Sequence, residues 1–211
     1  MSFNCLYNVR YIAREKMASP VLNREGMESN ALQVLFSRLV VFRNTPFGVD
    51  AWSAVGEPAG YAGRLHRLGE PLPMYASESA QASLRELDLH AEMPLEPARE
   101  VLRRVTAVAI PAGARVLLAD HVDTLDATGL TLEQVYDPDD YEACQLVADY
   151  ARSLPGAVAI STQSNAERQQ RTLAVLPEHA HMTAPVDYWE GSLNLLRLGL
   201  REREPVAHPS G

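Results

Sequence analysis

Short apolar runs separated by loops are the main pattern along this chain. The run ALQVLFSRLVVFR at 31–43 is densely apolar, and its end, LVVFR, predicts a buried strand. Further strands are predicted by the runs VLRRVTAVAI (101–110), ARVLLAD (114–120), AVAIS (157–161) and TLAVLP (172–177). The turn Pro-Ala-Gly joins the first two of these runs, so we expect them to close a hairpin-like unit.

Two other segments combine apolar and polar residues with a helical period. Residues 73–92 predict a short strand that turns into a helix, with Ser77 or Ser79 as its N-cap and Pro94 at its end. Residues 139–153, DDYEACQLVADYARS, predict an amphipathic helix.

The order of these elements predicts an α+β fold. Strands and helices mix without a regular β-α-β repeat, and the segment 186–199 fits either a strand or a short helix. Residues 44–73 contain five glycines and four prolines and predict a long loop region, which in a compact domain is usually functional or disordered. We expect one catalytic domain over 31–200, with an irregular extension at 1–30 and a polar tail at 201–211.

Composition and charge exclude several classes of protein. The formal net charge is -8, and the richest basic cluster is interleaved with glutamates, which argues against direct nucleic-acid binding. The sequence has no apolar run of 18 residues and no signal-peptide pattern, so we expect a cytoplasmic protein that does not enter a membrane. Its two cysteines, Cys5 and Cys144, do not make a disulfide framework.

Candidate chemistry begins with Arg64, Tyr75 and Glu86, which are spaced by eleven residues each. Each residue alone means little, but helix geometry places Glu86 on a stripe with Ala82 and Leu89. A carboxylate flanked in this way is either partly exposed at a cleft or needs a hydrogen-bonded partner, unless it is an ordinary surface glutamate. The core face of the same helix contains Ala80, Leu84, Leu87 and Ala91.

Two other groups of residues are candidate sites. Ser161 ends the apolar run AVAIS and enters a polar loop, a common place for either a ligand contact or a plain turn residue. His179 and His181 form an isolated His-x-His with no third ligand nearby in the sequence, so we expect no metal site.

The pieces around these residues resemble the RES-domain family, whose members are named for an arginine, a glutamate and a serine. GRLH, MYASES and SLRE are similar to the family's Gly-Arg, Leu-Tyr and Ala-Leu-x-Glu pieces in the same order. VFRN at 41–44 is similar to the strand that opens the domain, and the later strands and the helix containing Gln resemble the rest of the pattern. The resemblance covers roughly residues 40–180.

The resemblance implies a fold like that of ADP-ribosyltransferases, with two facing, mostly antiparallel sheets around a cleft and flanking helices. It implies NAD as the substrate, cleavage of the nicotinamide–ribose bond, no metal or other cofactor, and an antitoxin protein that occludes the cleft. Transfer of ADP-ribose to a protein is the alternative activity, and a catalytically silent binding module is the alternative of another class. The sequence does not distinguish water, phosphate or a side chain as the acceptor.

The resemblance also implies roles for individual residues. Glu86 would stabilise an oxocarbenium-like ribose, Arg64 would grip the pyrophosphate, and Tyr75 would stack on a ring of NAD. Arg43, in VFRN, is a further candidate for NAD binding. Ser161 matches the family's serine when counted from the preceding glycine, but the usual Pro or Arg neighbours are absent. The alternatives for that serine are Thr162 and Ser164.

Overall fold

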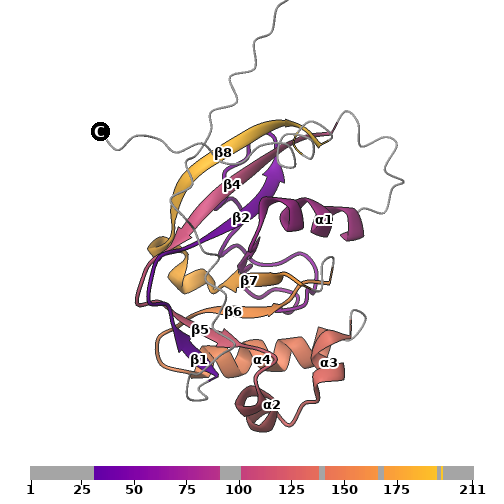
Figure 1. Ribbon diagram of the computed structural model, residues 1–211. Helices are drawn as coiled ribbons and strands as arrows, with labels where there is room; N and C mark the ends of the chain where they lie inside the picture. The colour runs from indigo at the N-terminus through magenta and orange to yellow at the C-terminus, as the bar shows by residue number, and fades with distance from the viewer. Residues whose placement is uncertain (1–30, 91–100, 138–140, 166–168, 194–195, 197–211) are drawn as a thin grey trace, which may run out of the picture.

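The computed structural model describes residues 31–90, 101–137, 141–165, 169–193 and 196. Its described strands form one mixed sheet of eight strands in the order β1-β5-β6-β7-β3-β2-β4-β8 (Figure 1). The pairings among them are antiparallel except for β5 with β6. The strands are β1 (Leu32–Val34), β2 (Leu39–Pro46), β3 (Met74–Ser77), β4 (Leu102–Ile110), β5 (Arg115–Leu118), β6 (Ala157–Gln163), β7 (Arg171–Val175) and β8 (Ala184–Ser192).

The α+β class is confirmed, but the expectation of two facing sheets is wrong. One sheet runs through both halves, because β3 pairs with β7 over four positions and with β2 at Phe42–Ser77. This short strand therefore joins the half formed by β2, β4 and β8 to the half formed by β1, β5, β6 and β7. The sheet bends at the junction, as Figure 1 shows.

The expected hairpin between the runs 101–110 and 114–120 does not form. Both edges of β4 are occupied, one by β2 and the other by β8, so β4 has no edge left for β5. The chain instead turns through Gly113, whose φ of 82° is in the left-handed region, and β5 pairs with β1 and β6. The segment 186–199, which fitted either class, begins within the strand β8.

Both predicted helices are present, and the described residues form three further short helical segments. Ser79, not Ser77, caps the predicted helix at 73–92, because its Oγ accepts a hydrogen bond of 3.0 Å from the backbone N–H of Ala82. The amphipathic helix at 139–153 is confirmed, whereas Pro94 lies outside the described residues. The helices are α1 (Ala80–His90), α2 (Val122–Thr128), α3 (Leu132–Tyr136) and α4 (Tyr141–Ser153), with a 3-10 helix, η2 (Pro177–Met182).

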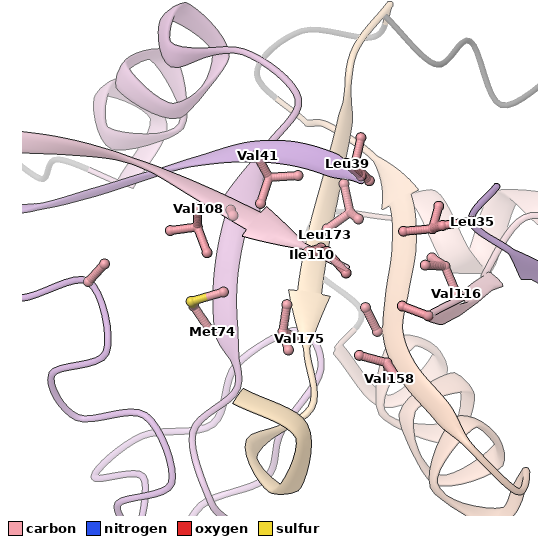
Figure 2. Packing of buried hydrophobic residues seen from close by; sticks show 14 residues of the cluster. Leu35, Leu39, Val41, Met74, Val108, Ile110, Val116, Val158, Leu173 and Val175 are labelled. Carbon is pink, nitrogen blue, oxygen red and sulfur yellow. The ribbon is translucent and has the colours of Figure 1, made fainter. Parts of the chain in front are cut away.

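The core lies on both faces of the bent sheet. On one face, apolar side chains from strands of both halves point toward a common centre (Figure 2). On the other face, α1 packs on β2 and β4, and α4 packs on β5, β6 and β7. The residues labelled in Figure 2 are Leu35, Leu39, Val41, Met74, Val108, Ile110, Val116, Val158, Leu173 and Val175.

Both long helices therefore cover the same face of the sheet. Phe42 packs with α1, and its strand partner Ser77 lies on the same face of the sheet. Because side chains alternate along a strand, Tyr75 of β3 and its partner Ala174 also lie on this face, and both pack with the α4 cluster. The region of the sheet between α1 and α4 is formed by β3, β7 and the end of β6. A candidate site in this region has helices on two sides and a sheet floor.

The predicted loop region is confirmed over the residues that follow β2. Between Phe47 and Pro73 the chain forms turns, with isolated bridges at Pro58–Pro71 and Gly63–His66. The expected extension at 1–30 and the tail at 201–211 lie outside the described residues. Among the described helices, none is long and apolar enough to cross a membrane.

Candidate functional site

Hydroxyl side chains replace apolar ones at one end of the sheet face between α1 and α4. Thr172 of β7 lies between Ser77 of β3 and Thr162 of β6 in the strand register. Ser164 follows β6 directly and is buried, as are Ser77 and Thr162. Buried hydroxyls require hydrogen-bonding partners, so a cluster of them at a strand end marks a place where polar chemistry is built into the core.

Glu86 of α1 is the charged group at this cluster. The hydroxyls of Ser164 and Thr172 both donate to Oε1 of Glu86, and the Thr172 bond measures 3.2 Å. The carboxylate is half-buried, and Ala82, one turn earlier on the helix, is fully buried. Among the possibilities that the sequence left open for Glu86, the structure shows a carboxylate with hydrogen-bonded partners.

The three candidate serine-type hydroxyls have different partners. Ser161 is fully buried, and its Oγ accepts a 2.7 Å hydrogen bond from Nε of Arg171. The hydroxyl of Thr162 donates to the carbonyl of Gln163 at 2.9 Å. Ser164 is the one of the three whose hydroxyl contacts Glu86. Strand alternation explains the difference, because Thr162 and Ser164 share one face of the sheet and Ser161 lies on the other.

Arg171, which holds Ser161, is the centre of a separate, half-buried network. Its guanidinium makes a bidentate pair with Asp120, with N–O distances of 2.6 and 3.0 Å, and Tyr136 donates to the same carboxylate at 2.5 Å. Burial alone raises the pKa of Asp120, but the hydrogen bonds and charge of Arg171, with help from Tyr136, outweigh it and lower that pKa. The network ties the ends of β5 and β7 to α3.

Glu78 lies just before α1, next to this network. Its carboxylate accepts a 2.9 Å hydrogen bond from the backbone N–H of Arg171, while its own N–H donates to the Arg171 carbonyl at 3.1 Å. Burial raises the pKa of Glu78 despite this hydrogen bond and the nearby guanidinium. The patterns in the sequence did not single out Glu78, Asp120 and Arg171. The available signal was their position as polar residues at strand ends.

Arg64 lies in the loop and reaches across to three other segments. Its Nε donates to Sγ of Cys144 at 3.2 Å, and its Nη2 donates to the carbonyl of Val135 at 2.7 Å. Its Nη1 donates to Oδ1 of Asn165 at 3.1 Å. The guanidinium is therefore fixed by neutral partners from α3, α4 and the segment after β6.

One short segment connects the arginine to the glutamate. Ser164 donates to Glu86, and the next residue, Asn165, accepts from Arg64. The carbonyl of Gln163 also lies 3.5 Å from Nη1 of Arg64. The structure thus brings Glu86 and Arg64 to the two sides of the segment 163–165, although they come from different elements.

Tyr75 supports the same loop from the sheet. Its hydroxyl accepts a 3.0 Å hydrogen bond from the backbone N–H of Leu65 and lies 3.1 Å from Nδ1 of His66. Burial raises the pKa of Tyr75 and lowers the pKa of His66, where the charge of Glu70 opposes the effect. The ring of Tyr61 packs edge-on against His66, with centroids 5.4 Å apart.

Arg43 is the predicted residue that the structure does not join to the others. Alternation along β2 places it on the face of Val41, opposite the face that α1 covers. Its Nη2 donates to the carbonyl of Ser53 at 3.4 Å, and its buried Nη1 has no hydrogen-bonding partner among the described residues. Burial lowers the pKa of Arg43, and the nearby Tyr61 and Asp50 oppose this.

The described part of the chain contains no cluster of three or more His, Cys, Asp or Glu side chains that could hold a metal ion. His179 and His181 both belong to η2. The arrangement around Glu86 and Arg64 instead offers a fixed carboxylate and a fixed guanidinium, which suit a ligand with positive and negative parts.

Comparisons with known proteins agree with this fold. The sequence profile of one family, described as the RES domain, matches residues 38–194. Among solved structures, the chain is similar to a chain of the M. tuberculosis MbcT–MbcA toxin–antitoxin complex, with a TM-score of 0.64 and 20% identity. That match covers 82% of this chain and 93% of the other, and at this identity it shows a shared fold. None of the curated proteins matches the sequence.

Proposed function

This chain belongs to the RES domain family, and from that premise we propose that it is a toxin-type enzyme that cleaves the nicotinamide–ribose bond of NAD. One observation supports the proposal most. The hydroxyls of Ser164 and Thr172 hold the Glu86 carboxylate, while Asn165, next in the chain, holds the Arg64 guanidinium. A dinucleotide with a cationic nicotinamide end and an anionic pyrophosphate suits such a pair of opposite charges.

Glu86 supplies the electrostatic part of the proposed reaction. When the bond between the ribose C1′ and the nicotinamide nitrogen breaks, its electron pair goes to the nitrogen and nicotinamide leaves neutral. The ribose then develops oxocarbenium character, and a carboxylate beside it offsets that positive charge. Water or phosphate next forms the new bond at C1′. A carboxylate fixed by two hydroxyl donors needs no reorganisation at that moment.

The other predicted residues take supporting roles in this proposal. Arg64 places a planar cation for the pyrophosphate, and Tyr75, whose hydroxyl is anchored, orients a ring of NAD. Arg43 is given no contact with NAD in this proposal, because it lies on the face of the sheet opposite to Glu86. For the family's serine we favour Ser164 over Ser161 and Thr162, since Ser164 contacts Glu86.

A separate antitoxin protein is part of the proposal. The similar M. tuberculosis structure is a toxin–antitoxin complex, and an enzyme that consumes NAD needs a restraint in its own cell. A site that binds an anionic dinucleotide through arginine also accepts a carboxylate-ended or acidic segment by the same geometry. We expect such a segment to lie near Arg64 and Glu86.

The deciding experiment is NAD consumption by the purified protein, with and without phosphate. We expect the parent chain to release nicotinamide and Glu86→Gln to retain the fold but lose about 10²–10³-fold in rate. Glutamine keeps one oxygen to accept from Ser164 and Thr172, so the substitution removes charge and little else. Glu57→Gln, at an exposed position in the loop, is the matched control and should consume NAD at the parental rate.

Each result separates the possible activities. ADP-ribose as product indicates hydrolysis, its phosphorylated form in phosphate indicates phosphorolysis, and NAD loss seen only with an added protein acceptor indicates ADP-ribose transfer. A folded parent chain that binds NAD without consuming it would be a silent binding module. Parental activity in Glu86→Gln would overturn the role assigned to this carboxylate.

A further inference from the structure

Arg64 lies at the tip of a tight turn, Gly63–His66. The turn is closed by the backbone N–H of Gly63, which donates to the carbonyl of His66 at 2.9 Å. It is also compact, because a Cβ added to Gly63 would lie 2.2 Å from Cε1 of the His66 ring. Gly63 is therefore the residue this close approach requires, and the position of Arg64 depends on what holds the Gly63–His66 turn.

One face of α4 holds this turn and the residue after it. Arg152 donates to the carbonyl of Leu65 at 3.4 Å, and Asp149 pairs with Arg67 at 2.8 Å. Cys144 accepts from Arg64, as described above. These contacts come from successive turns of a single helix, and Cys144 also belongs to the apolar face of this helix that packs on the sheet. Because α4 is fixed by its packing on the core, it holds in place a loop that has little regular structure of its own.

Gln145 makes the central contact of this set. Its side chain is buried, and its amide nitrogen donates to the carbonyl of Gly63 at 2.9 Å and to the carbonyl of His66 at 3.2 Å. These carbonyls belong to the first and last residues of the turn. A primary amide has two N–H donors on one nitrogen, so one group can bridge both carbonyls without burying a charge.

We propose that Gln145 is a positioning residue: it bridges the two ends of the Gly63–His66 turn and so fixes the Arg64 guanidinium at the NAD site. The inference rests on the proposed function for its effect on NAD, but the bridge itself is a matter of structure. A side chain displaced by about 1 Å from its productive place costs on the order of 10²-fold in rate. A loss of this size is therefore expected when the bridge is removed, although Gln145 does not contact the substrate.

The main test compares Gln145→Glu with Leu146→Glu, which introduces the same charge at the next position of α4. The carboxylate has nearly the same shape but presents oxygen to the two carbonyls, so it breaks the bridge. We expect kcat/KM for NAD to fall about 10–100-fold, with the same split between KM and kcat as in Arg64→Ala. Leu146→Glu adds the same charge at an exposed position of α4 and should retain parental activity. Gln145→Met also lacks donors but carries no charge, and it should lower kcat/KM for NAD by a similar factor to Gln145→Glu.

A double-mutant cycle distinguishes positioning from general damage. If Gln145 acts through Arg64, Gln145→Glu should have almost no further effect in an Arg64→Ala background. Hydrogen exchange gives a readout that needs no NAD: the Gly63 amide should exchange faster in Gln145→Glu, while α4 keeps its protection. Unchanged exchange at Gly63, or a full additional loss in the Arg64→Ala background, overturns the proposal. A different outcome is that the Gly63 amide exchanges faster in Gln145→Glu but the parent chain consumes no NAD. That result would confirm the bridge, and it would refute both the proposed function and the positioning role.

Discussion

Two arginines of the same loop show how environment decides what a residue can do. Arg64 is held by a thiol, a carbonyl and an amide, none of which neutralises its charge. Arg67 instead pairs with Asp149 and Glu70, and these side chains are partly exposed. Exposed ion pairs add little to stability, and Arg67 already has its anions. The positive charge available to a ligand is therefore that of Arg64.

Arg64→Lys should thus lower the rate of NAD consumption more than Arg67→Lys does. A lysine ammonium is a point charge and cannot reach Val135, Cys144 and Asn165 with one planar group. We expect a loss of at least about 10-fold in kcat/KM for Arg64→Lys, because a loss of one charge-assisted bidentate contact is of the order of 1.5–3 kcal/mol. Steady-state kinetics with NAD measures both variants. A larger loss for Arg67→Lys would overturn the assignment of the pyrophosphate contact to Arg64.

His66 predicts a pH dependence of stability. Burial lowers its pKa in the folded state, an effect that the charge of Glu70 opposes and that of Arg152 supports. The unfolded chain then binds the proton more readily than the folded one below a pH of about 6.5. The free energy of unfolding should therefore fall as the pH drops through that value. Urea unfolding at pH values between 7.5 and 5.5 measures this free energy. It should depend less steeply on pH in His66→Asn than in the parent, whereas the control His181→Asn, at an exposed position, should behave like the parent.

The sequence was most informative about single residues where geometry restricts them. Helix periodicity singled out Glu86 as a carboxylate between apolar neighbours but left open whether it has a partner, and the eleven-residue spacing singled out Arg64 and Tyr75. It could not name the partners, since Ser164 and Thr172 lie 78 and 86 residues away along the chain. The choice between Ser161 and Ser164 depends on which face of β6 each occupies, and that alternation has meaning only once the neighbouring strands are known.

At the scale of elements, the network of Asp120, Arg171 and Tyr136 joins α3 to the strands β5 and β7, which pair with β6 and not with each other in the described sheet. Asp120 follows β5, Arg171 begins β7, and Tyr136 ends α3. The Asp120 and Arg171 side chains are only 17% and 20% exposed, so solvent screens the pair weakly. Such a pair is destabilising to break because one charge is left without its partner.

Asp120→Asn should accordingly destabilise the fold. The amide keeps the size but loses the charge, and about 1–3 kcal/mol of unfolding free energy should be lost. The parental contribution is present above the unfolded pKa of about 3.9 and disappears as the pH falls through the lowered pKa of the folded state. The difference between parent and variant in urea unfolding should therefore be full at pH 7 and shrink on acidification below pH 4. Asp126→Asn, exposed on α2, should match the parent at both values.

Elements were predictable where their own residues determine them. The long strands and α4 follow from local periodicity, and Ser79 follows from capping chemistry. The pairing of strands was not predictable in the same way. The Pro-Ala-Gly turn favoured a local hairpin, but in the folded protein β2 and β8 occupy the two edges of β4. The short helices α2 and α3 have seven and five residues, too few for a period to be recognised.

At the scale of the whole molecule, the continuous sheet explains how the site is assembled. A single sheet bent at β3 places α1 and α4 on the same face, so groups from both halves meet above β7. Glu86 comes from the half that packs with β2 and β4, whereas Arg64 is anchored to the half that packs with α4. Motions of one half relative to the other would therefore change the distance between the two charges.

The proposed function makes its last prediction for the molecule inside a cell. An enzyme that needs only NAD and water or phosphate finds both in any cytoplasm, so expression of the parent chain in bacteria should lower NAD and then stop growth. Glu86→Gln, expressed to the same level, should leave both unchanged, because it removes the carboxylate charge from a fold that is otherwise retained. Glu57→Gln should be as harmful as the parent, which separates enzymatic toxicity from the burden of expression. Quantifying NAD in extracts before growth stops establishes the order of events. Harmless accumulation of a well-folded parent chain with unchanged NAD would refute the toxin proposal.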